Sequence, residues 1–234
     1  MIHKKKVISE LEKKLGLSFN NKELILTGLT HSSYANLKKE VKYNERMEYL
    51  GDAVLELIIS EYLFMRCEDK SEGDLTKARA LIVCENSLFE IANGWNLGKY
   101  ILMSKGEEST GGRNRSSILS NCVEAIIAAV YLDKGIEFTK EFVLKSFDDI
   151  INKAIENKIV LDYKTKLQEI LQQNGVIDIS YELAKLEGPP HRPKFFIDLK
   201  VENVTKSNGE GYTKKEAEQN AAKAYVQLME ELNE

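Results

Sequence analysis

The sequence predicts an all-α domain over residues 1–158, followed by a small α+β domain over residues 162–234 with the element order helix, three antiparallel strands, helix. In the first part, apolar residues recur at helical spacing and no stretch alternates in the manner of a strand. In the second part, a short amphipathic helix precedes alternating segments and a final Ala-rich helix. A chain of 234 residues is long enough for two such domains, each with its own core.

The charge balance limits the kinds of partner that the chain can have. Lys and Arg number 33 and Asp and Glu 37, so the formal net charge is -4, and neither predicted domain has an excess of basic residues. Because affinity for phosphate comes from Lys and Arg, this balance argues against indiscriminate binding of nucleic acid. Local basic patches remain compatible with it.

The cysteines and the N-terminal stretch indicate the cellular setting. Cys67, Cys84 and Cys122 are scattered and form no CxxC pair, which argues against a disulfide framework and against a cysteine zinc site. The N-terminal stretch contains no apolar run long enough for a signal peptide or a membrane span. We therefore expect a reduced, cytoplasmic protein with no membrane partner.

The stretch from Asn44 to Ile58, NERMEYLGDAVLELI, predicts a helix with two different faces. At about 100° per residue, Glu45, Glu48 and Asp52 fall on one face. We expect the apolar side to carry Met47, Leu50, Val54, Leu57 and Ile58. Asn44 is suited to the N-cap position, and acids in the first turn suit the helix dipole.

The acidic face of this helix has two interpretations. Three acids on one face repel one another, and a bound cation is a direct way to relieve that repulsion. The alternative is a solvated surface, with Glu45 placed only to suit the dipole, and helix geometry by itself favours this alternative. Glu56 lies on the same side one turn later, and we expect it to be an ordinary surface residue.

His31 precedes Ser32 and Ser33 in a polar turn. A histidine beside two serines suggests a nucleophile, but no acid is placed to orient the imidazole. We therefore expect local hydrogen bonding that shapes the loop.

Two further segments in the first domain carry polar signals. EGDLTKARA, residues 72–80, predicts the start of a helix with Asp74 as its cap. Residues 109–117, STGGRNRSS, place Arg113 and Arg115 beside two glycines, a combination that can hold phosphate through exposed amides and charge. A flexible connector is the equal alternative for this segment.

The stretch ILSNCVEAIIAAVYL, residues 118–132, is the most apolar predicted helix and is expected to be central. Glu124 lies inside it, with Asn121 three residues earlier on the same face. A carboxylate in such a run is costly to bury unpaired, so an acid here is expected to be a ligand or a paired group. An amphipathic helix after Gly135 then closes the domain, and the hinge that follows, residues 157–162, has no Pro or Gly run.

The second domain places basic residues at three points. KFFIDLKV predicts a clean strand, and a turn follows at Glu202 and Asn203. His191 and Arg192 project from a Pro-stiffened loop, and Lys214 and Lys215 open the last helix, where free amides also attract anions. The first helix, the loop and the last helix together match the footprint expected for double-stranded RNA. Ordinary surface lysines are the alternative for each point taken alone.

At this stage the chain resembles a known family. NERMEYLGDAVLEL is similar to the signature segment of ribonuclease III, and EGDLTKARA, the GEE-ST-GGRNRSSIL segment and the VEAIIAAVYLD run match in the same order. GPPHRPKFF and GYTKKEAEQNAAKAYVQL resemble a double-stranded RNA-binding domain. The resemblance covers nearly the whole chain.

This resemblance implies an endoribonuclease that hydrolyses double-stranded RNA and acts in the processing of ribosomal and other RNA. It implies that Glu48, Asp52 and Glu124 are acidic metal ligands, with Glu45 and Glu72 as supporting acids. The family is Mg²⁺-dependent, and Mn²⁺ is expected to substitute. It further implies a homodimer whose two sites each cut one strand, leaving 5′-phosphates and short 3′ overhangs, with the signature helix at the dimer interface. Hard oxygen ligands suit Mg²⁺, which activates water and offsets charge on the phosphate.

One residue departs from the family pattern. The family has an acid three residues before the last catalytic Glu, where this chain has Asn121. An amide oxygen can still ligate Mg²⁺, so one hypothesis is a working site that needs more Mg²⁺. The other hypothesis is a double-stranded RNA-binding protein with impaired catalysis.

Overall fold

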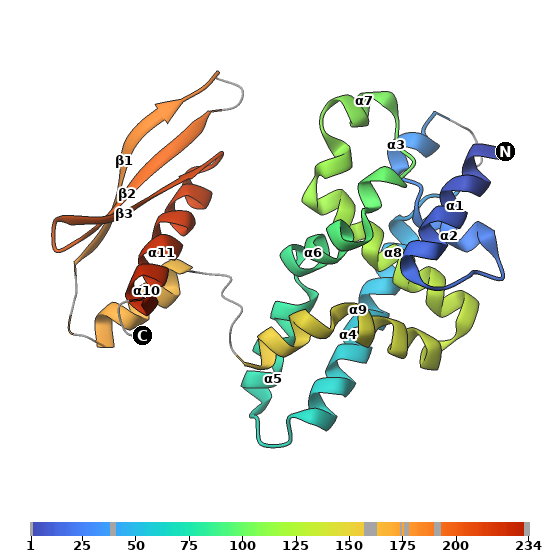
Figure 1. Ribbon diagram of the computed structural model, residues 1–234, viewed down its shortest axis with the longest axis horizontal. Helices are drawn as coiled ribbons and strands as arrows, with labels where there is room; N and C mark the ends of the chain where they lie inside the picture. The colour runs from blue at the N-terminus through green and yellow to red at the C-terminus, as the bar shows by residue number, and fades with distance from the viewer. Residues whose placement is uncertain are drawn as a thin grey trace. The chain divides into compact units, whose positions relative to one another are not determined.

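The computed structural model describes residues 2–37, 41–156, 163–173, 175, 178–189 and 193–231. The chain divides into two compact units, Met1–Ile159 and Val160–Glu234 (Figure 1). The first unit is helical, and the second combines a three-stranded antiparallel sheet with two helices. The predicted fold class is confirmed. The predicted hinge, residues 157–162, lies outside the described residues.

The first unit is built from α-helices joined by short connections. Its elements are α1 (Ile2–Leu15), α2 (Lys22–Gly28), α3 (Ser32–Ala35), α4 (Glu45–Arg66), α5 (Glu72–Val83), α6 (Glu85–Trp95), η1 (Leu97–Lys99), α7 (Lys105–Ser109), η2 (Gly112–Asn114), α8 (Ser116–Lys134) and α9 (Ile136–Ile155).

Helix α8 forms the centre of this unit, as its composition predicts. Its residues from Ala125 to Val130 are all fully buried, and α4, α2, α6 and α9 all pack against it. It is also the one described helix whose length and composition would fit a membrane span, but most of that stretch is buried inside the unit. A core helix has the same composition, and the packing shows that α8 is one.

Helix α4 is longer than predicted and amphipathic, with one error in the predicted apolar side. Met47, Val54 and Ile58 are buried as expected, whereas Leu57 is 61% exposed. At 100° per residue, Leu57 lies between the buried stripe and the opposite face, so a small offset in the packing direction turns it to solvent.

Of the two predicted helix caps, the structure confirms the position of Asn44 before α4 and corrects that of Asp74 in α5. Asn44 precedes α4 but makes no side-chain cap hydrogen bond, because its backbone is itself helical (φ -74°, ψ -19°). The cap of α5 is Ser71 rather than Asp74. The Ser71 hydroxyl accepts from the backbone N–H of Asp74 and donates to the Asp74 carboxylate, so the two residues form a reciprocal cap.

The second unit packs helices α10 (Tyr163–Gln173) and α11 (Lys214–Glu231) against the sheet β1 (Ile179–Glu187), β2 (Lys194–Val201) and β3 (Val204–Gly211), in the spatial order β1-β2-β3. Ile197, Leu199 and Val201 alternate along β2 and are buried. The predicted turn between β2 and β3 is present, with positive φ at both Glu202 and Asn203.

Candidate active site

The site is built where α4 crosses α8 at very short range. A Cβ added to Gly51 of α4 would overlap the backbone carbonyl oxygen of Glu124 and would lie 3.1 Å from the Glu124 Cα. A glycine is therefore required for the two backbones to approach this closely. The crossing brings the acids of α4 next to Glu124 of α8, two segments that lie far apart in the sequence.

Three carboxylates share this crossing and interact electrostatically. Burial, together with the nearby charges of Asp52 and Glu48, raises the pKa of Glu124 to about 8. Burial also raises the pKa of Glu48, while a hydrogen bond from Asn121 opposes this rise and the charges of Glu45 and Asp52 support it. Among the described residues, no Lys or Arg contributes to either shift. The cluster is therefore a concentration of negative charge that no cationic side chain of the described part of the chain compensates.

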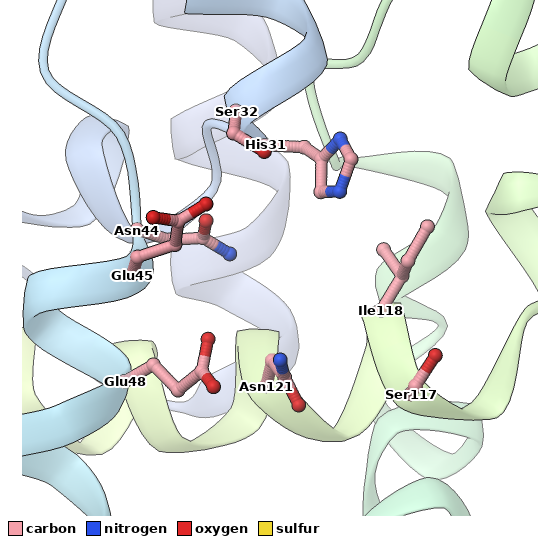
Figure 2. A pocket seen from close by; sticks show the side chains of 8 residues that line it. All are labelled: His31, Ser32, Asn44, Glu45, Glu48, Ser117, Ile118 and Asn121. Carbon is pink, nitrogen blue, oxygen red and sulfur yellow. The ribbon is translucent and has the colours of Figure 1, made fainter.

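A pocket of about 200 Å³ adjoins the crossing (Figure 2). Glu45 and Glu48 project into it from α4, and Ser117, Ile118 and Asn121 project from α8. A third wall comes from the segment before α4 and holds His31, Ser32 and Asn44. The pocket thus joins acidic oxygens to a set of neutral polar groups.

The donor chemistry of this site fits a hard divalent cation such as Mg²⁺. Glu48, Glu124, Asp52 and the Asn121 amide offer only oxygen ligands, and the coupled pKa shifts show that the acids repel one another. Among the described residues, no three His, Cys, Asp or Glu side chains converge tightly enough to make a ready-formed metal cluster. The site therefore fits Mg²⁺ in the type and the charge of its ligands. The Asn121 amide takes the place of a fourth acid.

The other predicted acids lie at different distances from this centre. Glu45 lines the pocket, beside Glu48. Glu72 is the exposed first residue of α5 and does not line the pocket. Glu56 is exposed, as expected for a surface residue.

The two arginines of the Gly-Gly segment hold the segment together. Arg113 donates to the Glu108 carboxylate at 2.5 Å and to the backbone carbonyls of Gly98 at 2.7 Å and Ile101 at 3.1 Å. Arg115 pairs with Glu107 at 2.5 Å. The segment contains η2 and is tied by these arginines to α7 before it, which differs from the flexible connector that was the alternative.

Two of the four predicted RNA-binding residues of the second unit are among the described residues. Lys214 and Lys215 are exposed in the first turn of α11, as predicted. His191 and Arg192 lie outside the described residues.

The pocket contains residues that the sequence did not single out for function. We expected His31 and the neighbouring Ser32 to make only local hydrogen bonds, Asn44 to cap a helix and Ser117 to lie in the Gly-Gly segment, and Ile118 carried no functional signal. The local hydrogen bonds of His31 are present. Its place beside Glu48 depends on a long-range backbone contact between Thr30 and Asn44, which no periodicity reveals.

Fold and site together define a helical nuclease domain joined to an RNA-binding unit. Residues 21–150 match the family model described as Ribonuclease-III-like, and residues 163–229 match the double-stranded RNA binding motif. This chain belongs to the ribonuclease III family.

Similar proteins cover most of the chain. A protein named Ribonuclease 3 from Clostridium kluyveri is 67% identical over 213 residues, which are 91% of this chain and 87% of that protein. A Ribonuclease 3 from Clostridium perfringens is 59% identical, over 95% of this chain and 94% of that protein. A solved nuclease domain of ribonuclease III from Campylobacter jejuni is 46% identical, covers 61% of this chain and 96% of that one, and superposes with a TM-score of 0.57. That structure is described as showing structural flexibility in a region involved in dimer formation.

Proposed function

We propose that the chain is an endoribonuclease that hydrolyses phosphodiester bonds of double-stranded RNA with bound Mg²⁺, leaving 5′-phosphates and short 3′ overhangs. Mn²⁺ is expected to substitute. The observation that carries the proposal is the uncompensated carboxylate cluster at the α4–α8 crossing, in a family member that also has a double-stranded RNA binding motif. We place its work in the cytoplasm, in the processing of ribosomal, messenger and transfer RNA.

The proposed roles follow from where each side chain lies. Glu48, Asn121 and Glu124 would hold Mg²⁺. Asp52 is exposed on α4 and its charge acts on Glu124, and it would act at the edge of the metal site. Glu45 and Glu72 are assigned supporting roles. When bound, Mg²⁺ supplies an activated water and offsets negative charge on the phosphate in the transition state. The Asn121 amide holds the Glu48 carboxylate in place through its hydrogen bond.

We further propose that the active form is a homodimer. Leu57, Phe64 and Met65 are 61–69% exposed on α4, and Tyr49 on the same helix is 82% exposed. Large apolar side chains exposed along one helix are compatible with a surface that binds another protein surface. In the proposed dimer, each copy cuts one strand.

Duplex RNA is expected to contact the second unit through Lys214 and Lys215, with His191 and Arg192 as further predicted contacts. Arg115, whose side chain is 44% exposed, remains a candidate in the first unit. Arg113 is engaged by three groups of its own domain, so we assign it chiefly to folding.

The alternative of an RNA-binding protein with impaired catalysis has no support in the comparisons, since the similar proteins carry the name Ribonuclease 3. Glu48, Asp52 and Glu124 are all retained. Asn121 also forms a hydrogen bond with Glu48, so its side chain contacts the acidic site.

The proposal is tested by incubating the purified chain with a long RNA duplex, single-stranded RNA and a DNA duplex across a Mg²⁺ titration. We expect the chain to cleave only the RNA duplex and to leave 5′-phosphate ends. We expect no cleavage in the presence of a chelator. Binding of the duplex without cleavage at any Mg²⁺ concentration would overturn the proposal.

A further inference from the structure

We propose that His31 binds the RNA backbone at the active site, donating from Nε2 to a phosphate oxygen that enters the pocket beside Glu48. This inference rests on the proposed function and adds a substrate-binding residue outside the acidic set. It is carried by the hydrogen-bond network that fixes the ring, by the anchoring of its segment and by the composition of the pocket.

The first step concerns which ring nitrogen carries the hydrogen. The backbone N–H of Ser33 donates to His31 Nδ1 at 3.3 Å, and the Ser33 hydroxyl lies 2.8 Å from the same atom. The Ser33 oxygen accepts from the backbone N–H of Ser104 at 3.1 Å, so its own hydrogen is available for Nδ1. Nδ1 is therefore an acceptor, and the ring hydrogen lies on Nε2.

The second step concerns how firmly the ring is placed. The His31 backbone N–H donates to Leu102 at 2.9 Å, and the neighbouring Thr30 carbonyl accepts from Asn44, the residue before α4, at the same distance. Thr30 is 1% exposed and forms a parallel bridge with Leu102. His31 is thus fixed between two other segments and held close to the start of α4, which is the arrangement that a binding residue needs.

The third step concerns what the pocket is suited to bind. Its volume of about 200 Å³ is below the range of roughly 300–1,000 Å³ for pockets that enclose whole small molecules. It therefore suits a single group of a larger ligand. Within the described part of the chain, His31 Nε2 and the hydroxyls of Ser32 and Ser117 have no hydrogen-bond partner, and Figure 2 shows all three residues around the space that Glu48 borders.

A phosphodiester is the group that matches these donors. Its oxygens accept hydrogen bonds, and it must approach a site that already gathers carboxylates. A Lys or Arg in this place would pair with Glu48 and compete with a cation, whereas neutral donors bind the phosphate and leave the acids free for Mg²⁺.

Two substitutions separate this role from a structural one, because His31 is also the N-cap of α3. His31→Asn keeps an oxygen that can accept from the Ser33 N–H, since Asn is among the best N-cap residues, but it is too short to reach the pocket as Nε2 does. His31→Gln places an amide N–H near the position of Nε2 and loses the cap.

We expect His31→Asn to lower kcat/KM for a short RNA duplex by roughly 10- to 100-fold at unchanged stability, because hydrogen bonds to charged groups contribute that much. We expect His31→Gln to retain more activity than His31→Asn even where its unfolding midpoint falls. The reverse order, with full activity in His31→Asn, would show that the ring serves only as a cap and would overturn the inference.

A matched set of substrates tests whether the partner is a phosphate. Duplexes carrying one neutral methylphosphonate linkage are compared with duplexes carrying one 2′-deoxyribose, each scanned through the positions around the cut. At one linkage the methylphosphonate should abolish the difference between the natural chain and His31→Asn, as expected when two changes remove one interaction. If no methylphosphonate does so, or if only a 2′-deoxy substitution does, the phosphate assignment is wrong.

The same series run in an Asn121→Asp background distinguishes this inference from the proposed function. If the natural chain does not cut but the Asn121→Asp chain does, the proposed function has failed for the natural chain, and the role of His31 is decided in the Asn121→Asp chain. If neither chain cuts duplex RNA, the proposed function has failed, and the inference falls with it. If both cut and His31→Asn matches its parent in each, only the inference has failed.

Discussion

Gly51 lies directly against the backbone carbonyl of Glu124, and this contact brings two halves of one acidic site together. Neither helix contains the site alone. Helix α4 supplies Glu48 and Asp52, and α8 supplies Glu124 and Asn121. The distance between the helix backbones therefore controls the geometry of the carboxylates.

Gly51→Ala is expected to separate the helices and damage both stability and metal use. Overpacking a close contact typically costs about 1–3 kcal/mol, and here the added Cβ meets backbone that has little freedom to move. Urea unfolding should show the loss, and cleavage should need more Mg²⁺.

Gly28→Ala is the matched control for this prediction. A Cβ at Gly28 would lie 3.1 Å from the carbonyl oxygen of Ala125, on the same helix α8 but in a contact that a small shift relieves. We expect a smaller loss of stability and an unchanged Mg²⁺ requirement. Equal effects of the two substitutions on the Mg²⁺ midpoint would contradict a special role for the Gly51 contact.

The stability of the metal-free protein should fall as pH rises, because of Glu124. Its pKa is 4.5 in the unfolded reference and about 8 in the folded chain, so the folded state holds the proton more tightly. Below 4.5 both states are protonated and the group has no effect. Between pH 4.5 and about 8 the Glu124 carboxyl ionises in the unfolded chain but stays protonated in the folded chain, so the free energy of unfolding falls as pH rises. Above pH of about 8 the group is ionised in both states, and its effect on the free energy of unfolding is constant.

Glu124→Gln should remove most of this pH dependence, because the amide does not titrate. Urea midpoints measured in a chelator across the pH window are the readout. A natural chain and a Glu124→Gln chain with parallel profiles would show that Glu124 does not carry the effect.

Asn121→Asp is expected to lower the Mg²⁺ concentration at half-maximal cleavage. The substitution adds a negative ligand and also removes the amide that donates to Glu48. Without metal, the extra acid should therefore destabilise the fold, since it joins carboxylates that already repel one another. A shift of the midpoint to higher Mg²⁺ would be inconsistent with Asn121 lying at the metal site.

Lys214→Ala together with Lys215→Ala should weaken binding of duplex RNA and flatten its salt dependence. Each phosphate contact contributes about 0.7–0.9 to the slope of log K against log salt, so the pair should reduce the slope by roughly 1–2. Lys206→Ala, which removes one positive charge from an exposed residue of β3, is the control and should leave the slope nearly unchanged. Equal slopes for all three chains would exclude α11 from the RNA contact.

Much of the fold could be predicted because local periodicity and core burial agree. The apolar run around Glu124 became the central helix, and KFFIDLKV became the middle strand, each with its apolar residues inside. Errors arose where two local signals competed. Ser71 rather than Asp74 caps α5, and Leu57 faces outward although it is apolar.

The site could be predicted only in part, because part of it depends on tertiary contacts. Spacing placed Glu48 and Asp52 on one helix face, and the cost of burying an acid drew attention to Glu124, but only the family resemblance implied that the three are metal ligands, which stays a prediction. The place of His31 follows from hydrogen bonds that link Thr30 to Asn44 and His31 to Leu102, across long stretches of sequence. The arginines of the Gly-Gly segment were equally compatible with a phosphate site, but their partners Glu107 and Glu108 lie in a short helix, α7, which precedes that segment.

The central claim is that the carboxylate cluster at the α4–α8 crossing performs hydrolysis, and Glu124→Gln tests it most directly. Cleavage of a long RNA duplex and binding of the same duplex are measured side by side for this variant and the natural chain in saturating Mg²⁺. We expect binding to remain within about threefold, since His31, Lys214 and Lys215 are all retained, while cleavage falls by at least roughly 100-fold, as when a group needed only in the transition state is removed. Cleavage by Glu124→Gln at the natural rate would contradict the account.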